Sequence, residues 1–126
     1  MPTMPMLSML ESYLKLTTSR EQAITANMAN VDTPGYRTRD IDFLTEMKKA
    51  TSEGLVQSEN GTATAQMNPV LQEVQGLMER PDGNNVDIDR EGLLMAETQL
   101  QYQIGVQLVK RQFHQMLSAI NGGGQS

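Results

Sequence analysis

Residues 93–120, LLMAETQLQYQIGVQLVKRQFHQMLSAI, carry the pattern that decides the fold. Apolar side chains recur there at helical spacing along two stripes, and from Tyr102 onward the second stripe keeps an unbroken four-three heptad spacing. This pattern predicts a long helix from about Asp89 to Ile120. The first stripe is Leu93, Ala96, Leu100, Ile104 and Leu108, and the second is Met95, Tyr102, Val106, Val109, Phe113, Met116 and Ile120.

The two stripes lie on nearly opposite faces of this helix, because successive helical residues are rotated by about 100°. A surface helix of a monomer needs one apolar face, so a helix with two apolar faces needs two partners. We expect one face to pair within the subunit and the other between subunits, with most of the intersubunit contact on the second stripe from Tyr102 to Ile120. Asp87 or Asp89 can cap the start of the helix, and Asn121-Gly122 can end it.

The N-terminal segment predicts a second long helix, from about Met6 to Asn30. Its heptad seam has two polar interruptions, Thr17 and Glu21. The helix stops at residues 32–35, Asp-Thr-Pro-Gly, because proline disfavours helical geometry in the residue before it and Pro-Gly is a turn signal. The seam consists of Leu7, Leu10, Leu14, Thr17, Glu21, Ile24, Met28 and Val31.

The middle of the chain has a weaker pattern. Residues 41–47 could extend or form a short helix, whereas residues 51–68 are rich in Ser, Thr, Gly, Asn and Gln and predict a mobile loop. Residues 70–74 and 77–78 could form a short strand pair around Gly76.

The predicted fold is therefore mainly α, a coiled-coil-like pair of long N- and C-terminal helices joined by an irregular middle segment with possible short strands. Residues 1–36 form the N-terminal helix and its turn, residues 37–88 the connecting segment, and residues 89–126 the C-terminal helix and tail. Both ends together form a single domain.

Composition argues against several function classes. The 126-residue chain has a formal net charge of −5, and its densest basic run is Lys110-Arg111, whereas nucleic-acid binding needs a concentrated basic surface. No cysteine is present, which excludes disulfides and thiolate metal sites. The N-terminus lacks the basic and continuous apolar regions of a cleavable signal peptide. No segment approaches the roughly 20 apolar residues of a membrane span.

The residues that could carry chemistry have ordinary structural interpretations. The acidic run at 87–91 partly resembles the start of an EF-hand loop, but it opens a strong helical pattern, where carboxylates are favoured. His114 is the single histidine and suits a helix position better than a triad or a metal cluster. Asp40 and Asp42 are interpreted as part of an exposed loop rather than as an acidic pair. We expect no catalytic residue, no cofactor, no metal and no enzymatic activity.

Residues 27–36, NMANVDTPGY, closely resemble the N-terminal signature of the flagellar axial proteins, which include rod, hook and hook-associated proteins. In that family the pattern Asn-x-Ala-Asn-x-x-Thr-Pro-Gly, followed by Tyr or Phe, ends an N-terminal helix, and every fixed position is met. Asn30 and Asp32 can end the helix through side-chain to backbone bonds, and Tyr36 can fold back onto the helical pair. The signature positions are Asn27, Ala29, Asn30, Thr33, Pro34, Gly35 and Tyr36.

Three further stretches narrow the resemblance to the rod proteins of the proximal basal body. Residues 37–43, RTRDIDF, are similar to the continuation of the signature in those proteins. Residues 82–91, DGNNVDIDRE, and residues 96–103, AETQLQYQ, are similar to the segment that leads into their C-terminal helix. Gly92 departs from the family pattern, in which an apolar or larger residue is usual.

The resemblance implies a structural subunit of the bacterial flagellar basal-body rod. Its terminal helices would form an antiparallel pair and pack with those of other subunits into an axial tube that transmits torque. It implies a place in the periplasmic rod, reached through the type III export apparatus without a cleaved signal. Expected partners are other rod proteins, copies of itself and the adaptor that joins the rod to the MS ring. The expected packing residues are Leu7, Leu10, Leu14, Ile24, Met28, Leu100, Tyr102, Ile104, Val106, Val109, Phe113, Met116 and Ile120. The alternative is a cytosolic helical-hairpin export chaperone or adaptor.

Overall fold

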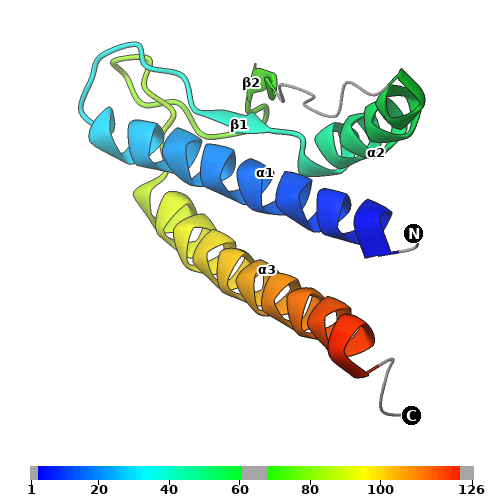
Figure 1. Ribbon diagram of the computed structural model, residues 1–126. Helices are drawn as coiled ribbons and strands as arrows, with labels where there is room; N and C mark the ends of the chain where they lie inside the picture. The colour runs from blue at the N-terminus through cyan, green and yellow to red at the C-terminus, as the bar shows by residue number, and fades with distance from the viewer. Residues whose placement is uncertain (1–2, 61–67, 123–126) are drawn as a thin grey trace.

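The computed structural model describes residues 3–60 and 68–122 and is mainly helical, as predicted (Figure 1). Within those residues, two long helices come from the two ends of the chain, and a shorter helix and a small sheet lie between them in sequence. The elements in chain order are α1 (Thr3–Ala29), β1 (Arg39–Ile41), α2 (Phe43–Asn60), β2 (Leu71–Glu73) and α3 (Ile88–Gly122). None of the described helices is long and apolar enough to span a membrane.

Helix α1 is the central element of the fold. In Figure 1, α3 runs antiparallel along one side of α1, while α2 and the sheet lie on the other side. The direction follows from two contacts: Asn27 bonds to Glu91 near the start of α3, and Leu14 approaches Gly105 halfway along it. The antiparallel pairing of the terminal helices is therefore confirmed.

The sequence pattern indicated one seam on α1, whereas the structure has two. The predicted seam includes Leu10, Thr17 and Ile24, which are all buried. A neighbouring face, spaced three and four residues apart, bears on the sheet and α2, where the Tyr13 ring packs edge-on against Phe43 with 5.5 Å between ring centroids. This second face consists of Tyr13, Leu16, Arg20, Ala23 and Asn27.

The loop predicted from Thr51 is wrong as far as Asn60, because α2 continues to that residue. Residues 61–67 of the predicted loop lie outside the described residues. Asp42 caps α2: its carboxylate accepts hydrogen bonds from the backbone N–H of Thr45 at 3.3 Å and from the Thr45 hydroxyl at 2.8 Å. The aromatic contact made by Phe43 then holds the start of α2 on α1.

The predicted strand pair around Gly76 is also wrong in its partner. β2 pairs antiparallel with β1, with Asp40 opposite Gln72. The hydrogen bond from the Val74 backbone N–H to the Thr38 carbonyl, 2.9 Å long, extends this ladder. Long-range pairing with β1 therefore replaces the local hairpin that the sequence suggested.

Candidate functional site: the terminal helix pair and its clamp

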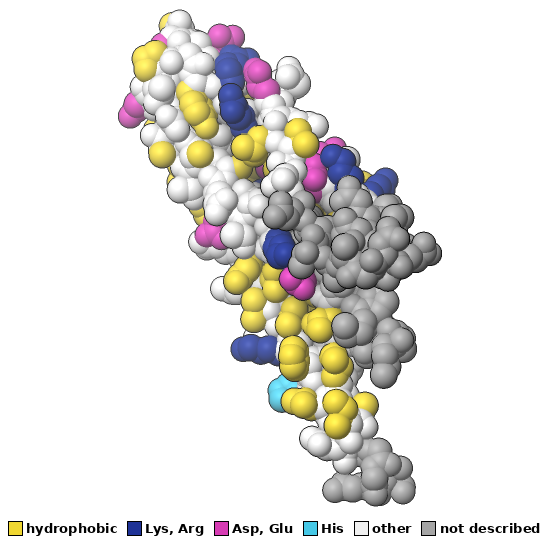
Figure 2. Space-filling view, turned by 45° about the horizontal axis from the view of Figure 1, so that its top comes forward, with side chains coloured by type: hydrophobic (Ala, Val, Ile, Leu, Met, Phe, Trp, Pro, Cys, Tyr) yellow, Lys and Arg dark blue, Asp and Glu magenta, His cyan; other side chains and the backbone are white. Residues whose placement is uncertain are grey.

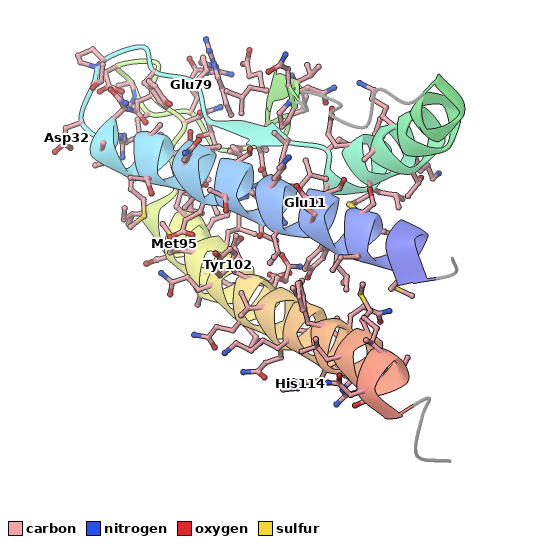
Figure 3. The ribbon with its side chains drawn as sticks, in the orientation of Figure 1. Glu11, Asp32, Glu79, Met95, Tyr102 and His114 are labelled. Carbon is pink, nitrogen blue, oxygen red and sulfur yellow. The ribbon has the colours of Figure 1, made fainter. Side chains whose placement is uncertain are left out.

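The signature turn directly follows α1 and has the geometry that its proline and glycine favour. The Tyr36 backbone N–H donates to the Thr33 carbonyl at 3.2 Å, and Gly35 has a φ of 76°. Pro34 and Gly35 thus occupy the central positions of a type II turn, the second of which needs a positive φ. Asn30 ends the helix as expected, because its side-chain amide donates to the Ala26 carbonyl at 2.8 Å. The exposed Asp32 lies beside the C-terminal end of α1, just before this turn (Figure 3).

A second segment, residues 82–85, holds this turn in place. The Gly35 backbone N–H donates to the Asp82 carbonyl at 2.9 Å. The fully buried side-chain amide of Asn84 donates to the carbonyls of Asn30 at 2.9 Å and Thr33 at 2.8 Å. These carbonyls follow the last turn of α1, where helical partners are lacking. Asn84 therefore serves as a C-terminal cap delivered from a distant part of the chain.

The same segment also binds the strand that leaves the turn. The Thr38 backbone N–H donates to the Asn85 side-chain oxygen at 2.7 Å, and the Asn85 backbone N–H donates to the Tyr36 carbonyl at 3.3 Å. The signature turn and residues 82–85, which both belong to stretches that resemble flagellar axial proteins, therefore form one hydrogen-bonded unit. About 50 residues of chain separate Asn84 from the turn that it caps.

Asn27 is the signature residue with the most complete set of partners. Its side-chain N–H groups donate to the Arg39 carbonyl and to Glu91 Oε1, both at 2.8 Å. Its side-chain oxygen accepts from the Arg39 backbone N–H at 3.1 Å and from the Tyr36 hydroxyl at 3.3 Å. Asn27 is 1% exposed, and a buried amide is stable only when its polar atoms are paired. It therefore fixes α1 to α3, to β1 and to the turn at once.

Glu91 is the buried carboxylate of this unit and belongs to a chain of charged groups. Its Oε2 accepts from Arg90 at 2.6 Å, and Arg90 in turn lies 4.0 Å from Asp40. Asp40 also accepts two hydrogen bonds from Arg20, at 3.2 and 3.1 Å. The Asp40 side chain is 12% exposed, so the interpretation of Asp40 as part of an exposed loop is wrong. The residues join α1, β1 and α3 because alternating charges compensate one another.

We call the four buried polar side chains Asn27, Asn84, Asn85 and Glu91 the polar clamp.

The acidic residues at 87–91 have two different roles. The Asp87 carboxylate accepts from the backbone N–H groups of Asp89 and Arg90, at 3.1 and 3.3 Å, and caps α3. Glu91, four residues beyond Asp87 and so about one helical turn further along, instead faces α1 and bonds to Asn27. No group of three or more metal-ligating side chains occurs among the described residues.

The two apolar stripes of α3 have different surroundings. On the second stripe, Val106, Val109 and Met116 are half-buried, whereas Tyr102, Phe113 and Ile120 are exposed. Figure 3 shows Tyr102 on the side of α3 toward α1 and His114 on the side away from it. Gly105 is buried against α1, where a Cβ atom would lie 2.7 Å from Leu14 Cδ2. The predicted intersubunit role of the second stripe stays a prediction.

The first stripe lies opposite α1 and its large side chains are uncovered in the subunit. We call Leu93, Leu100, Ile104 and Leu108 the outer face of α3; they are 69%, 57%, 48% and 40% exposed, respectively. The exposed Ala96 completes this stripe. A shallow groove runs along the same side and is lined by Leu100, Gln103, Ile104, Gln107, Leu108, Lys110, Arg111 and His114. In Figure 2, hydrophobic side chains gather over the C-terminal half of α3. His114 is exposed at the rim of this groove, as a surface helix position.

Sequence reasoning identified the signature turn but not what holds it. The stretch at residues 82–91 resembles rod proteins, but the sequence assigned no role to three of its residues, Asn84, Asn85 and Glu91. Arg20 and Asp40 carried no pattern that could pair them. Two consecutive asparagines after Asp-Gly were the available signal, because asparagine side chains bond readily to backbone groups in turns.

Two terminal helices that are clamped at one end and leave an apolar helix face uncovered, together with the signature turn, define a flagellar axial protein. No protein-family model matches the sequence. The chain is 35% identical over 125 residues to flagellar basal body rod protein FlgB of Salmonella typhimurium, covering 90% of this chain and 91% of that protein. It is 33% identical over 125 residues to FlgB of Escherichia coli, with the same coverage. It is also 33% identical over 114 residues to FlgB of Cereibacter sphaeroides, covering 86% and 88%. The chain therefore belongs to the FlgB family of flagellar basal body rod proteins.

Proposed function

We propose that this rod protein is a structural subunit that assembles through its terminal helices into the axial tube of the basal body and transmits torque by packing, without turnover. The outer face of α3 carries this proposal. Covering an exposed Leu or Ile side chain stabilises a contact by about 1.5–3 kcal/mol when the side chain goes from full exposure to full burial. Leu100 and Ile104 are 57% and 48% exposed, so each would contribute roughly half of that range on assembly.

The polar clamp supports the mechanical part of the proposal. A subunit that transmits torque must resist relative movement of its two long helices. Asn27 and Glu91 bond α1 to α3 directly, and the turn after α1 is capped by Asn84. Buried polar groups are costly to leave unpaired, so these bonds oppose sliding of one helix along the other.

The proposed partners are other rod proteins, copies of this chain, the adaptor that joins the rod to the MS ring, and the export apparatus. The resemblance of both ends of the chain to axial proteins supports this set. We further propose that the subunit reaches the periplasmic part of the rod without a cleaved signal peptide. The names of the relatives from Salmonella typhimurium and Escherichia coli assign those proteins to the basal body rod.

The outer face is tested by charge insertion, with each variant supplied to a deletion strain of a motile bacterium that lacks its own FlgB and swims again only when a functional copy is provided. The variant Leu100→Asp with Ile104→Asp places two carboxylates on the outer face. The control Thr18→Asp with Gln22→Asp places the same charges, also four residues apart, on exposed positions of α1. We expect the first variant to lose swimming in soft agar and to be recovered with purified basal bodies at least about tenfold less than the control, because a charge is costly to bury at a packed interface.

Circular dichroism of both purified variants controls for folding. Normal swimming and normal recovery of the Leu100 and Ile104 variant would exclude the outer face as an assembly contact. Recovery of the unmodified chain from the cytosol alone, absent from basal bodies, would instead support the export chaperone or adaptor.

A further inference from the structure

The two ends of the elongated helix pair carry opposite charges. One end, which we call the open end, contains the last turns of α3 and lies on the same side of the molecule as the first turns of α1 (Figure 1). Residues 98–122 contain Lys110, Arg111 and His114 but no acidic residue. All three side chains are exposed and line the groove beside Ile104 and Leu108.

The clamped end, formed by the signature turn and residues 78–91, is acidic at its surface. Asp32, Asp82, Asp87 and Asp89 are all exposed. Exposed apolar side chains lie among these acids in the sequence: Met78 is 90% and Ile88 47% exposed.

The basic residues at the clamped end are already engaged within the subunit. Arg37 contacts Glu73 at 2.8 Å and Glu79 at 3.5 Å. Arg80 donates to the Val31 carbonyl. Residues 78–91 contain five acidic and two basic residues, so this end presents a net negative charge to a partner even though Arg80 keeps its own charge.

The acidic and basic groups cannot pair within one subunit. Asp89 and Arg111 both belong to α3, and at 1.5 Å per residue they lie about 33 Å apart along it. Among the described residues, none of the ion pairs includes Lys110, Arg111 or the four aspartates. Opposite charges that cannot meet within a chain can meet between two chains, where they select orientation and increase the association rate.

We propose that the basic groove at the open end of one copy receives the acidic clamped end of a second copy in a head-to-tail contact. Lys110 and Arg111 would face Asp32 and Asp89, while Ile104 and Leu108 would cover Met78 and Ile88. Such a contact uses two different surfaces, so it repeats along an axis instead of closing into a symmetric dimer. The inference rests on the proposed assembly through the terminal helices and names the surfaces that meet.

Charge exchange tests the contact with the full-length chain in sedimentation velocity. One variant, Lys110→Glu with Arg111→Glu, makes the open end acidic. The other, Asp32→Lys with Asp89→Lys, makes the clamped end basic and leaves Asp87, which caps α3, in place. We expect the unmodified chain to self-associate with increasing concentration and less so at high salt. Each variant alone should associate at least about tenfold more weakly, and an equimolar mixture of the two should regain association, since each acidic end then meets a basic one.

Arg39→Glu with Lys48→Glu is the matched control, because it reverses two exposed basic residues, on β1 and α2, that belong to none of the ion pairs of the described residues. It should leave association unchanged. A monomeric unmodified chain, variants that associate normally, a control that dissociates equally, or a mixture that does not recover would each overturn the inference. Circular dichroism identifies a charge-reversal variant that does not fold. The neutralising variants Arg111→Gln and Asp89→Asn then replace the reversals. Unchanged association of both neutralising variants would equally overturn the inference. Loss of basal-body recovery on changing the outer face, with normal association here, would separate the two proposals.

Discussion

The clamped end and the open end of the helix pair are built from different interactions. At the clamped end, Asn27, Asn84 and Glu91 are at most 1% exposed, and their side chains are paired with hydrogen-bonding partners. At the open end, Phe113 and Ile120 are 53% and 74% exposed. Hydrogen bonds require specific geometry, whereas apolar contact is non-directional. One end therefore fixes the arrangement of the helices, and the other leaves apolar surface for a partner to cover.

Removing the Asn84 side chain should have the largest effect on stability, because it weakens the clamped end and leaves the open end unchanged. Asn84→Ala removes the two bonds to the carbonyls of Asn30 and Thr33, and one bond from the Val86 backbone N–H. A buried polar group left unpaired costs about 1–3 kcal/mol, so we expect the free energy of unfolding to fall by about 3 kcal/mol in urea denaturation followed by circular dichroism. Asn121→Ala, at an exposed position of the open end, should change it by less than about 0.5 kcal/mol. Equal effects of the two substitutions would contradict a clamped end that dominates stability.

The two helical glycines of α3 provide a smaller and more local test. A Cβ atom at Gly105 would lie 2.7 Å from Leu14 Cδ2 and 3.1 Å from the Tyr13 ring, whereas one at Gly92 would meet nothing within 4 Å. Alanine favours a helix over glycine by about 1 kcal/mol, but overpacking costs about 1–3 kcal/mol. Gly105→Ala should therefore destabilise the subunit by about 1 kcal/mol, and Gly92→Ala should stabilise it by up to about 1 kcal/mol.

The melting temperatures of both variants check this difference in sign. Stabilisation by both substitutions would mean that α1 and α3 have room to separate at Gly105, and that the helix pair is held together chiefly at its clamped end. Destabilisation by Gly92→Ala would place unrecognised contacts around the first turns of α3.

The sequence predicted the two long helices and the turn between Thr33 and Tyr36 because these features depend on local patterns. Heptad spacing determines which residues of α3 are apolar together, and proline with glycine determines the turn. The antiparallel pairing was expected from the resemblance to the flagellar axial proteins and not from a local pattern.

The polar clamp could not be predicted in the same way. Asn84 and Glu91 act on groups that are 51–64 residues away in the chain, and polar residue types at isolated positions carry no periodicity. The same reasoning explains α2: its composition from Thr51 onward favoured a loop, whereas the structure continues the helix that Asp42 caps and Phe43 anchors on Tyr13. Contacts between distant segments decided these features, and a single sequence does not show them.

Asp42 offers the smallest expected effect, and it affects neither end of the helix pair. Hydrogen bonds from the hydroxyl and the backbone N–H of Thr45 hold the pKa of Asp42 below its usual value. A lowered folded-state pKa contributes stability that is present above the unfolded pKa, about 3.9, and is lost as the pH falls through the folded pKa. Asp42→Asn keeps a capping oxygen but does not titrate.

We therefore expect the parent chain to be slightly more stable than Asp42→Asn at neutral pH and to lose that advantage as the pH falls below about 4. Urea denaturation of both chains across this range measures the difference, and the backbone N–H resonance of Thr45 reports the cap itself. A difference in stability that stays constant with pH would show that the Asp42 charge does not support α2. Because α2 lies beside α1 and away from α3 (Figure 1), the titration should leave the resonances of the polar clamp and of the open end unshifted, which separates the cap from both regions compared above.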